Sequence, residues 1–339
     1  MKTIILDQPG AFRACDSEPQ SSLQPGEARV RVHRLGVCGT DLHAFRGKQP
    51  FFEYPRILGH ELGVEVLEVG ENDFGLKPGD HCAIEPYLNC GSCVACRRGK
   101  PNCCVNMKVL GVHVDGGMRE QLVVPVEKLH ASNTLSFDQL ALVETIGIGA
   151  HAVNRARVQP GETALVIGCG PIGLGAMAMA KAEGADVIAL DMSESRLEFC
   201  QSALGVEHVV GAGENAAETI QGLTMSEFPT VVFDCTGNKD SMRQSIHFLA
   251  HGGRLVYVGL FIGDFSLPDP EFHKRETTLL SSRNATSEDM QHVMRCMENG
   301  KVDVKPWITH RVAADAMPSE FESWLEPGAG VVKAVVEWA

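Results

Sequence analysis

The spacing of apolar residues divides the chain into a β-rich first part and a second part in which strands and helices alternate. Residues 28–32 and 63–69 alternate apolar and polar side chains, which is the pattern of half-buried strands. Turn pairs such as Pro78-Gly79 separate segments of this kind up to about residue 135. We therefore expect residues 1 to about 135 to form irregular β structure.

A long helix is predicted to connect the two parts. Ser136 and Gln139 form a capping-box pattern at its start, the apolar positions continue past Glu144 to about Val158, and Pro160-Gly161 ends it. Beyond it we predict strands near residues 163–168, 186–191, 207–210, 230–235 and 254–259, and helices near residues 171–183, 193–204, 214–222 and 240–250. Such alternation is typical of a doubly wound parallel sheet.

The alternation lapses after about residue 275. One further helix is predicted from Thr286, with Asp289 three residues later, to the helix-stop glycine Gly300. A final strand at 331–336 is expected to return to the first domain. The predicted domains are a first domain at 1–143 with a lobe at 88–105, a second domain at 144–275, and a return to the first domain at 276–339.

Composition mainly excludes classes of partner. A chain of 339 residues exceeds one ordinary core, so two domains are expected, and 44% hydrophobic with 22% charged residues is typical of a soluble globular protein. The net charge of −13 argues against nucleic acid or an anionic membrane as a partner, and no apolar run has the length of a signal peptide or a membrane span. Cysteines clustered at metal-ligand spacing, with most others single among apolar residues, favour metal binding over disulfides and a cytoplasmic location.

A glycine-rich turn follows the first predicted strand of the second domain. In this G-x-G-x-x-G pattern Gly168 makes the tight turn, Gly170 lets the backbone approach a pyrophosphate, and Gly173 lets helix pack on strand. The helix that follows offers its N-terminal N–H groups to the anion. Asp191 ends the next strand, where a ribose-binding acid is expected, and its charge repels a 2′-phosphate. We therefore predict NAD over NADP. Arg196 lies nearby and could receive a 2′-phosphate, but with Asp191 present we expect it to cover the adenine or to pair with the acid.

Four cysteines predict a closed metal site. Cys90, Cys93 and Cys96 are followed eight residues later by Cys104, and four thiolates at this spacing form a tetrahedral zinc site without an open position. Cys103 is adjacent and could compete, but the eight-residue step favours Cys104. The alternative, two disulfides, suits a secreted protein. We expect a structural zinc that keeps its lobe folded and takes no part in chemistry.

A second group of metal-binding residue types lies in the first domain. Cys38 is followed by Thr40 and His43, and His60 is adjacent to Glu61. Taken singly, a buried cysteine is usually a small hydrophobe and a lone histidine a hydrogen-bonded side chain. Together with the dinucleotide turn, they suggest a catalytic zinc site that keeps one position open for water or substrate.

Together these motifs resemble the zinc-containing alcohol dehydrogenases of the medium-chain dehydrogenase/reductase superfamily, and the likeness covers essentially the whole sequence. Within that group the chain is most similar to the polyol and sugar-acid branch, above all to bacterial L-galactonate and L-gulonate 5-dehydrogenases. The segments that carry this closer likeness are residues 47–52, 110–117, 269–278 and 282–286. The resemblance implies an α/β fold with a GroES-like catalytic domain and a Rossmann domain, two zinc ions per chain, NAD, and a homodimer or homotetramer.

The resemblance also assigns roles to residues. It implies that the catalytic zinc is held by Cys38, His60 and either Glu61 or Glu144, and both carboxylates remain open. Thr40 and His43 would relay a proton through the cofactor ribose. The further cofactor contacts are assigned to Pro171, Ile172, Thr236, Val258 and Gly259. The substrate pocket is assigned to Phe51, Phe52, His113, Glu144, Arg283 and Asn284.

The expected activity is oxidation of a secondary alcohol in a small molecule. Zinc makes a bound oxygen far more acidic, and the nicotinamide accepts the hydride. By resemblance the substrate is a sugar acid of the L-galactonate or L-gulonate type, whose carboxylate needs a cation such as Arg283. The alternatives are a polyol such as sorbitol or galactitol, an L-threonine 3-dehydrogenase-like activity, a zinc-free quinone or enone reductase, and a non-enzymatic scaffold with only the zinc lobe.

Overall fold

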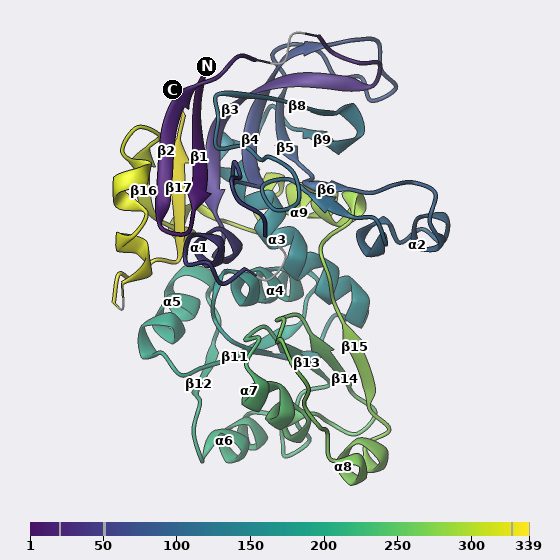
Figure 1. The fold of residues 1–339 in the computed structure, drawn as a ribbon. Coiled ribbons are helices and arrows are strands. Elements are labelled where there is room, and N and C mark those ends of the chain that lie inside the picture. Colours follow the sequence, from purple (N-terminus) through teal and green to yellow (C-terminus); the bar gives the residue numbers. More distant parts are fainter. Residues whose placement is uncertain (20–21, 50–51, 327, 339) are drawn as a thin grey trace. The chain divides into compact units, whose positions relative to one another are not determined.

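The structure is a computed structural model that describes residues 1–19, 22–49, 52–326 and 328–338 (Figure 1). It divides into two compact units. Unit 1 contains Met1–Glu144, Thr286–Glu298 and Val304–Ala339, and unit 2 contains Thr145–Ala285 and Asn299–Asp303. The expected α/β fold, with one β-rich part and one parallel-sheet part, is confirmed.

Unit 1 is built on a seven-stranded sheet. Its strands are β3 (Glu27–Val37), β4 (Glu61–Val69), β5 (His81–Ile84), β8 (Gln121–Pro125), β9 (Leu129–Ala131), β16 (Ile308–Ala313) and β17 (Lys333–Glu337). The strand order is β16-β17-β3-β4-β5-β9, and β8 also pairs with β3. The last strand, β17, pairs antiparallel with β3, with Ala334 opposite Val37, so the end of the chain lies in the sheet of unit 1.

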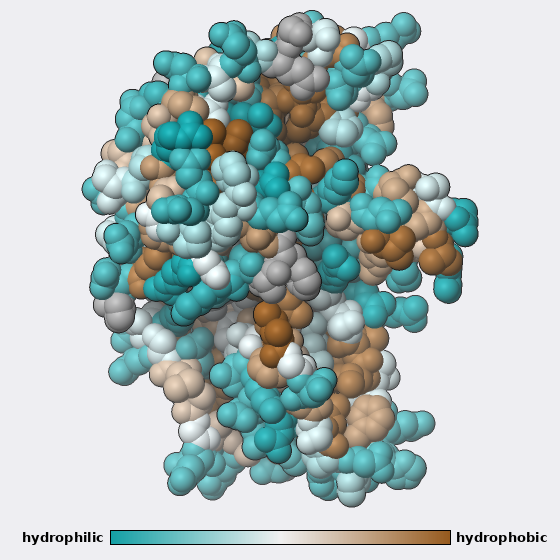
Figure 2. Space-filling view, in the orientation of Figure 1, coloured by the Kyte–Doolittle hydropathy of each residue, from teal (hydrophilic) through white to brown (hydrophobic). Residues whose placement is uncertain are grey.

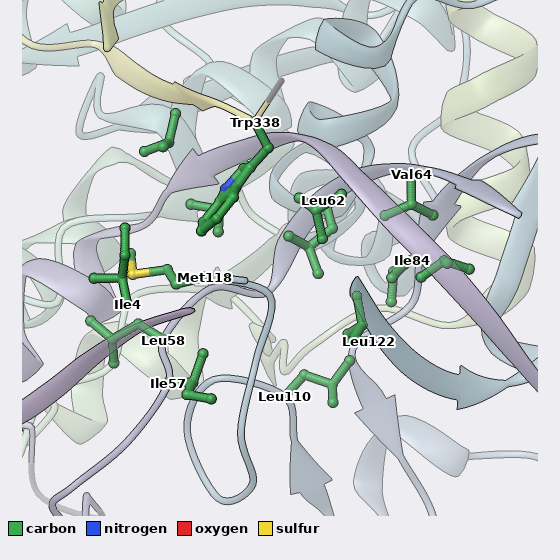
Figure 3. Close-up of a cluster of buried hydrophobic side chains, with 14 of the residues drawn as sticks. Ile4, Ile57, Leu58, Leu62, Val64, Ile84, Leu110, Met118, Leu122 and Trp338 are labelled. Carbon is green, nitrogen blue, oxygen red and sulfur yellow. The ribbon is translucent and has the colours of Figure 1, made fainter. Parts of the chain in front are cut away.

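Smaller elements complete unit 1. They are the strand pairs β1 (Lys2–Gln8) with β2 (Ala11–Asp16) and β6 (Tyr87–Leu88) with β7 (Lys108–Val109), the helices α1 (Gly39–Phe45), α2 (Val94–Arg97), α9 (Ser287–Glu298) and α10 (Met317–Glu320), and 3-10 turns at Pro101–Cys103, Val126–Lys128, Lys305–Trp307 and Ser323–Leu325. The core collects the inward-facing residues of β3 and β4 together with Met118 and Trp338 (Figure 3).

The helix α3 (Phe137–Ala156) carries the chain from unit 1 into unit 2, and the unit boundary falls between Glu144 and Thr145. Its predicted capping box is present. The backbone N–H of Ser136 donates to Gln139 Oε1 at 3.0 Å, and that of Gln139 donates to Ser136 Oγ at 3.3 Å. Two of the orphan N–H groups that every helix start leaves are satisfied in this way.

Unit 2 holds a six-stranded sheet that is parallel throughout. Its strands are β10 (Thr163–Ile167), β11 (Asp186–Asp191), β12 (His208–Gly211), β13 (Val231–Asp234), β14 (Arg254–Tyr257) and β15 (Thr278–Ser281). Its helices are α4 (Pro171–Ala182), α5 (Glu194–Leu204), α6 (Ala216–Leu223), α7 (Lys239–Gln244) and α8 (Asp269–Lys274), with a 3-10 turn at Ser245–Phe248. The order β12-β11-β10-β13-β14-β15 reverses between β10 and β13, which is where doubly wound sheets bind dinucleotides.

Two features of unit 2 differ from the expectation. The sheet continues past residue 275, because β15 pairs with β14 and the unit extends to Ala285. Three of the four residues of β15 are exposed, so no apolar alternation marked this edge strand in the sequence. The helix expected over residues 240–250 is α7 followed by the 3-10 turn. Among the residues that the structure describes, no helix has the length and apolar character needed to cross a bilayer.

Candidate active site

Three of the predicted metal ligands converge in unit 1. One donor atom from each of Cys38, His60 and Glu61 lies within 4.8 Å of the other two. Cys38 immediately precedes α1, His60 immediately precedes β4, and Glu61 is the first residue of β4. The β3–β4 register places Gly36 opposite Glu61, and a Cβ on Gly36 would lie only 2.2 Å from Glu61 Oε2. The glycine thus leaves the space that the carboxylate occupies.

A buried lysine orients the Glu61 carboxylate. Lys333 Nζ, from β17, donates to Glu61 Oε1 at 2.6 Å and to the carbonyl oxygen of Val37 at 3.3 Å. Its side chain is only 2% exposed. Burial alone would lower the pKa of Lys333, but the carboxylate of Glu61 and the nearby Cys38 raise it above its usual value. Lys333 therefore stays a cation and neutralises part of the negative charge of the donor group.

Asp41 is a buried carboxylate that lies close to both Cys38 and His60. The backbone N–H of Cys38 donates to Asp41 Oδ2 at 2.9 Å, and Asp41 Oδ1 lies 3.9 Å from His60 Nδ1. Burial raises the pKa of Asp41. Burial lowers the pKa of His60, but the neighbouring Cys38 and Asp41 raise it well above its usual value overall.

The donor set fits a zinc ion. His60 Nδ1 and Asp41 Oδ1 are buried and have no hydrogen-bond partner within the described part of the chain. A thiolate, an imidazole and a carboxylate that converge in one buried place are the donors of catalytic zinc sites, in which three protein ligands leave a further position open. A carboxylate near a ligand histidine is also the usual outer partner that orients such a ring.

The second carboxylate that the sequence left open, Glu144, takes a different place. Glu144, on α3, is not part of the group of donors that lie within 4.8 Å of one another. Tyr87, from β6, donates its hydroxyl to Glu144 Oε1, and both side chains are buried. Burial raises the pKa of Glu144. Thr40 and His43 both lie on α1 one turn apart, Thr40 half-buried and His43 exposed.

The four predicted lobe cysteines also converge. The sulfurs of Cys90, Cys93, Cys96 and Cys104 lie within 4.8 Å of one another, and Cys103 is exposed and outside the group. Backbone N–H groups of Ser92 and Cys93 lower the pKa of Cys90 to about 5, which favours the thiolate. Four sulfurs in one place suit a closed tetrahedral zinc site.

The lobe that carries these sulfurs is bracketed by β6 and β7, and Figure 2 shows hydrophobic surface where Figure 1 labels α2. In the same lobe, the side chains of Val94 and Val105 are exposed. A segment that leaves such side chains in solvent has little apolar burial to stabilise it. We therefore expect a bound metal to supply much of the stability of the lobe.

The glycine turn of unit 2 has the geometry of a dinucleotide site. Gly168 follows β10 with φ +92°, which favours glycine, and Gly170 caps α4 at its N-terminus. A Cβ on Gly173 would lie 1.8 Å from the carbonyl oxygen of Gly168. Any side chain at this position would clash, so glycine is what allows α4 to pack closely against the turn. Pro171 is the first residue of α4 and Ile172 the second, at the helix end that attracts anions.

Asp191 is tied to this turn by one of its oxygens and to the start of α5 by the other. Asp191 Oδ2 accepts the backbone N–H of Cys169 at 2.6 Å, and Oδ1 accepts that of Ser193 at 2.8 Å. Arg196, on α5, reaches the carbonyl oxygen of Cys169 at 3.4 Å and lies 3.2 Å from the place of a Cβ on Gly170. Asp191 therefore stabilises the conformation of the glycine turn and also lies at the carboxyl end of β11.

The remaining predicted residues are divided between the units. Thr236, Val258 and Gly259 follow the carboxyl ends of β13 and β14, where ligands of parallel sheets bind. In unit 1, Phe52 packs against the core and His113 is exposed, with its Nδ1 accepting the backbone N–H of Val109 at 3.1 Å. In unit 2, Arg283 is exposed and Asn284 has φ +55°. Phe51 lies outside the described residues.

The sequence interpretation missed two residues of this site. Lys333 lies in the apolar run 331–336, where a single charge was the available signal. Tyr87 lies between a proline and a leucine and carried no signal, because its partner Glu144 is 57 residues away.

Comparison with known proteins agrees with the two-unit structure. Residues 24–134 match the family described as the alcohol dehydrogenase GroES-like domain, and residues 171–299 match the family described as zinc-binding dehydrogenase. The chain is 41% identical to L-galactonate-5-dehydrogenase of Escherichia coli (strain K12) over 310 residues, which is 91% of each chain. It is 31% identical to L-arabinitol 4-dehydrogenase of Hypocrea jecorina, over 94% of this chain and 86% of that protein.

A solved structure has a similar fold. The structure of an alcohol dehydrogenase (rspB) from Escherichia coli CFT073, complexed with NADH, matches with a TM-score of 0.90 and 26% identity, and the match covers 100% of this chain and 99% of that one. The donor group, the glycine turn and these similarities lead to one conclusion. The chain belongs to the zinc-type alcohol dehydrogenase family and is a dehydrogenase.

Proposed function

We propose that this protein oxidises a secondary alcohol of a sugar acid, of the L-galactonate or L-gulonate type, with NAD as hydride acceptor and zinc at the Cys38–His60–Glu61 group. The observation that carries the proposal is the convergence of these three donors in a chain that also has the dinucleotide turn at Gly168–Gly173. The similarity to L-galactonate-5-dehydrogenase supports the sugar-acid class.

The proposal gives each of these residues a role. Cys38, His60 and Glu61 hold the metal, and Lys333 keeps the Glu61 carboxylate turned and partly neutralised. When bound, zinc acts as a Lewis acid that lowers the pKa of an alcohol, and NAD accepts the hydride. Thr40 and His43 would relay the proton of the alcohol to solvent by way of the cofactor ribose, with the Thr40 hydroxyl giving up its own proton as it takes that of the alcohol.

NAD is preferred because of Asp191. Its carboxylate lies at the end of β11, and its charge would repel a 2′-phosphate at that position. The ratio of kcat/KM for NAD and NADP measures the preference, and a larger value for NADP would contradict this assignment.

The substrate class is tested with a panel of compounds. Hexonates, hexitols and L-threonine are offered with NAD, and the absorbance of the reduced cofactor is followed. Turnover of hexonates at a kcat/KM well above that of hexitols is expected. The similarity to L-arabinitol 4-dehydrogenase favours a polyol as the second candidate, and activity on hexitols alone would replace the sugar acid with it.

Arg283 has a specific part in this proposal. A guanidinium can bind a carboxylate through two parallel hydrogen bonds, so Arg283 is assigned to the carboxylate of the sugar acid, with Asn284 beside it. We expect Arg283→Lys to raise KM for hexonates while leaving KM for NAD unchanged. An equal effect on both would assign Arg283 to the cofactor.

The setting of the enzyme is part of the same proposal. The structure describes all twelve cysteines and joins none of them in a disulfide, and we propose a cytoplasmic homodimer or homotetramer. Sedimentation of the purified protein measures its oligomeric state, and a monomer at working concentrations would contradict this part.

A further inference from the structure

Tyr87 is a buried tyrosine next to the proposed metal site that the reaction described above does not use. Its side chain is 3% exposed, and its hydroxyl donates to Glu144 Oε1. Burial raises the pKa of Tyr87 well above its usual value, and the neighbouring Glu144 adds to this effect, so the hydroxyl keeps its proton and acts as a donor.

The backbone around Tyr87 is held on both sides. Tyr87 pairs with Val109 in the two-stranded β6–β7 sheet, at the neck of the cysteine lobe. Lys128 Nζ donates to Glu85 Oε1 at 2.6 Å on one side of Tyr87 and to Asn89 Oδ1 at 2.8 Å on the other. These contacts hold the segment that carries Tyr87 against unit 1, so its hydroxyl occupies a defined position from which it donates to Glu144.

The two carboxylates of the site have different partners. Glu61 belongs to the donor group and is paired with the cation Lys333. Glu144 lies outside that group and accepts a hydrogen bond from the neutral Tyr87. Burial has the largest effect on the pKa of Glu144, but the charge of His60 also lowers it and that of Glu61 raises it. Glu144 is therefore close enough to the donor group for a shift of its carboxylate to change the ligands of a bound metal.

We propose that Tyr87 is a positioning residue, whose hydroxyl holds the Glu144 carboxylate beside the donor group and keeps it from becoming a metal ligand, so that Glu61 is the carboxylate that binds the metal. The proposal rests on the proposed function, since it assumes a metal at Cys38 and His60. It assigns to β6 a role in deciding which carboxylate binds a metal held at the starts of α1 and β4.

Tyr87→Phe removes the hydroxyl and keeps the ring. With Co²⁺ in place of the catalytic zinc, we expect weaker visible absorption bands than in the wild type, because a released Glu144 adds a ligand to a four-coordinate ion. We also expect a chelator to remove the metal more slowly from the variant, because one more ligand must then dissociate. In a Glu144→Ala background, Tyr87→Phe should change neither the spectrum nor the release rate.

Tyr257→Phe is the matched control. Tyr257 is also buried and donates its hydroxyl to the carbonyl oxygen of Met242 at 2.7 Å, but it lies in unit 2. The cobalt spectrum of this variant should equal that of the wild type. A change of the same size in Tyr257→Phe would assign the effect to general destabilisation and overturn the proposal.

Two further results would overturn it. One is a Tyr87→Phe spectrum and release rate equal to those of the wild type, and the other is an unchanged effect in the Glu144→Ala background. Failure of the proposed function has a separate signature. If Cys38→Ser binds as much cobalt as the wild type, no metal is held at Cys38, and both proposals fall together.

Discussion

Replacing Lys333 by methionine tests the electrostatics of the donor group. Lys333 Nζ lies 2.6 Å from Glu61 Oε1, so their Coulomb attraction is about 6 kcal/mol at an effective dielectric constant of about 20. Returning the ammonium to water in the unfolded state offsets several kcal/mol of this attraction, and removing one partner of a buried pair typically costs about 3–5 kcal/mol. We expect Lys333→Met to lose about 4 kcal/mol of unfolding free energy in chelator-treated protein.

Tryptophan fluorescence during urea unfolding is the assay. All three tryptophans, Trp307, Trp324 and Trp338, are buried in unit 1, so their emission reports that unit. With a denaturant slope of about 2 kcal/mol/M, a loss of about 4 kcal/mol lowers the midpoint by about 2 M. With zinc restored, the shift should be smaller, because a bound cation then compensates the Glu61 carboxylate.

The pair is tested further with Glu61→Gln. In the double variant Lys333→Met/Glu61→Gln the uncompensated buried charge is absent, so the total loss should be well below the sum of the two single losses. Additive losses would refute the assigned coupling. Equal shifts of Lys333→Met with and without zinc would show that the metal does not bind beside Glu61.

Three further predictions concern other parts of the chain. Burial alone would raise the pKa of Glu85, but His130, Lys128 and Ser287 hold it below its usual value, so the charged carboxylate stabilises the fold. Glu85→Gln should therefore cost about 3 kcal/mol of unfolding free energy at pH 7. The cost should shrink as the pH falls below roughly 4, measured by urea unfolding across pH. Cys96→Ser should lose one zinc ion per chain by elemental analysis and expose the lobe to limited proteolysis, and an unchanged zinc content would contradict the four-sulfur site. A Cβ at Gly173 would clash with Gly168, so Gly173→Ala should weaken NADH binding, measured by fluorescence titration, by roughly tenfold, whereas Gly211→Ala, which meets no atom within 4 Å, should bind as the wild type.

Local patterns were enough to predict much of unit 2. The strand predicted at 186–191 corresponds residue for residue to β11, because its interior, 187–190, is buried and appears in the sequence as a continuous apolar segment. The start of α3 followed from the Ser136 and Gln139 pair, whose side chains interact within one helical turn. Edge strand β15 escaped prediction because its exposed side chains follow no periodic pattern.

The candidate site was predictable in its residue types and only partly in its geometry. The spacing of Cys90, Cys93, Cys96 and Cys104 is local, and the structure brings these four sulfurs together. The choice between Glu61 and Glu144 could not be made from spacing. It depends on the β3–β4 register, which opens space for Glu61, and on a lysine 272 residues away in the chain.

The central claim, a catalytic zinc at Cys38, is tested most directly by comparing zinc content and turnover in the wild type and Cys38→Ser. We predict two zinc ions per chain and hexonate oxidation in the wild type, against one zinc ion, held by the cysteine lobe, and no turnover in the variant. A Cys38→Ser protein that keeps both zinc ions, or one that turns over hexonates at the wild-type rate, would contradict the account.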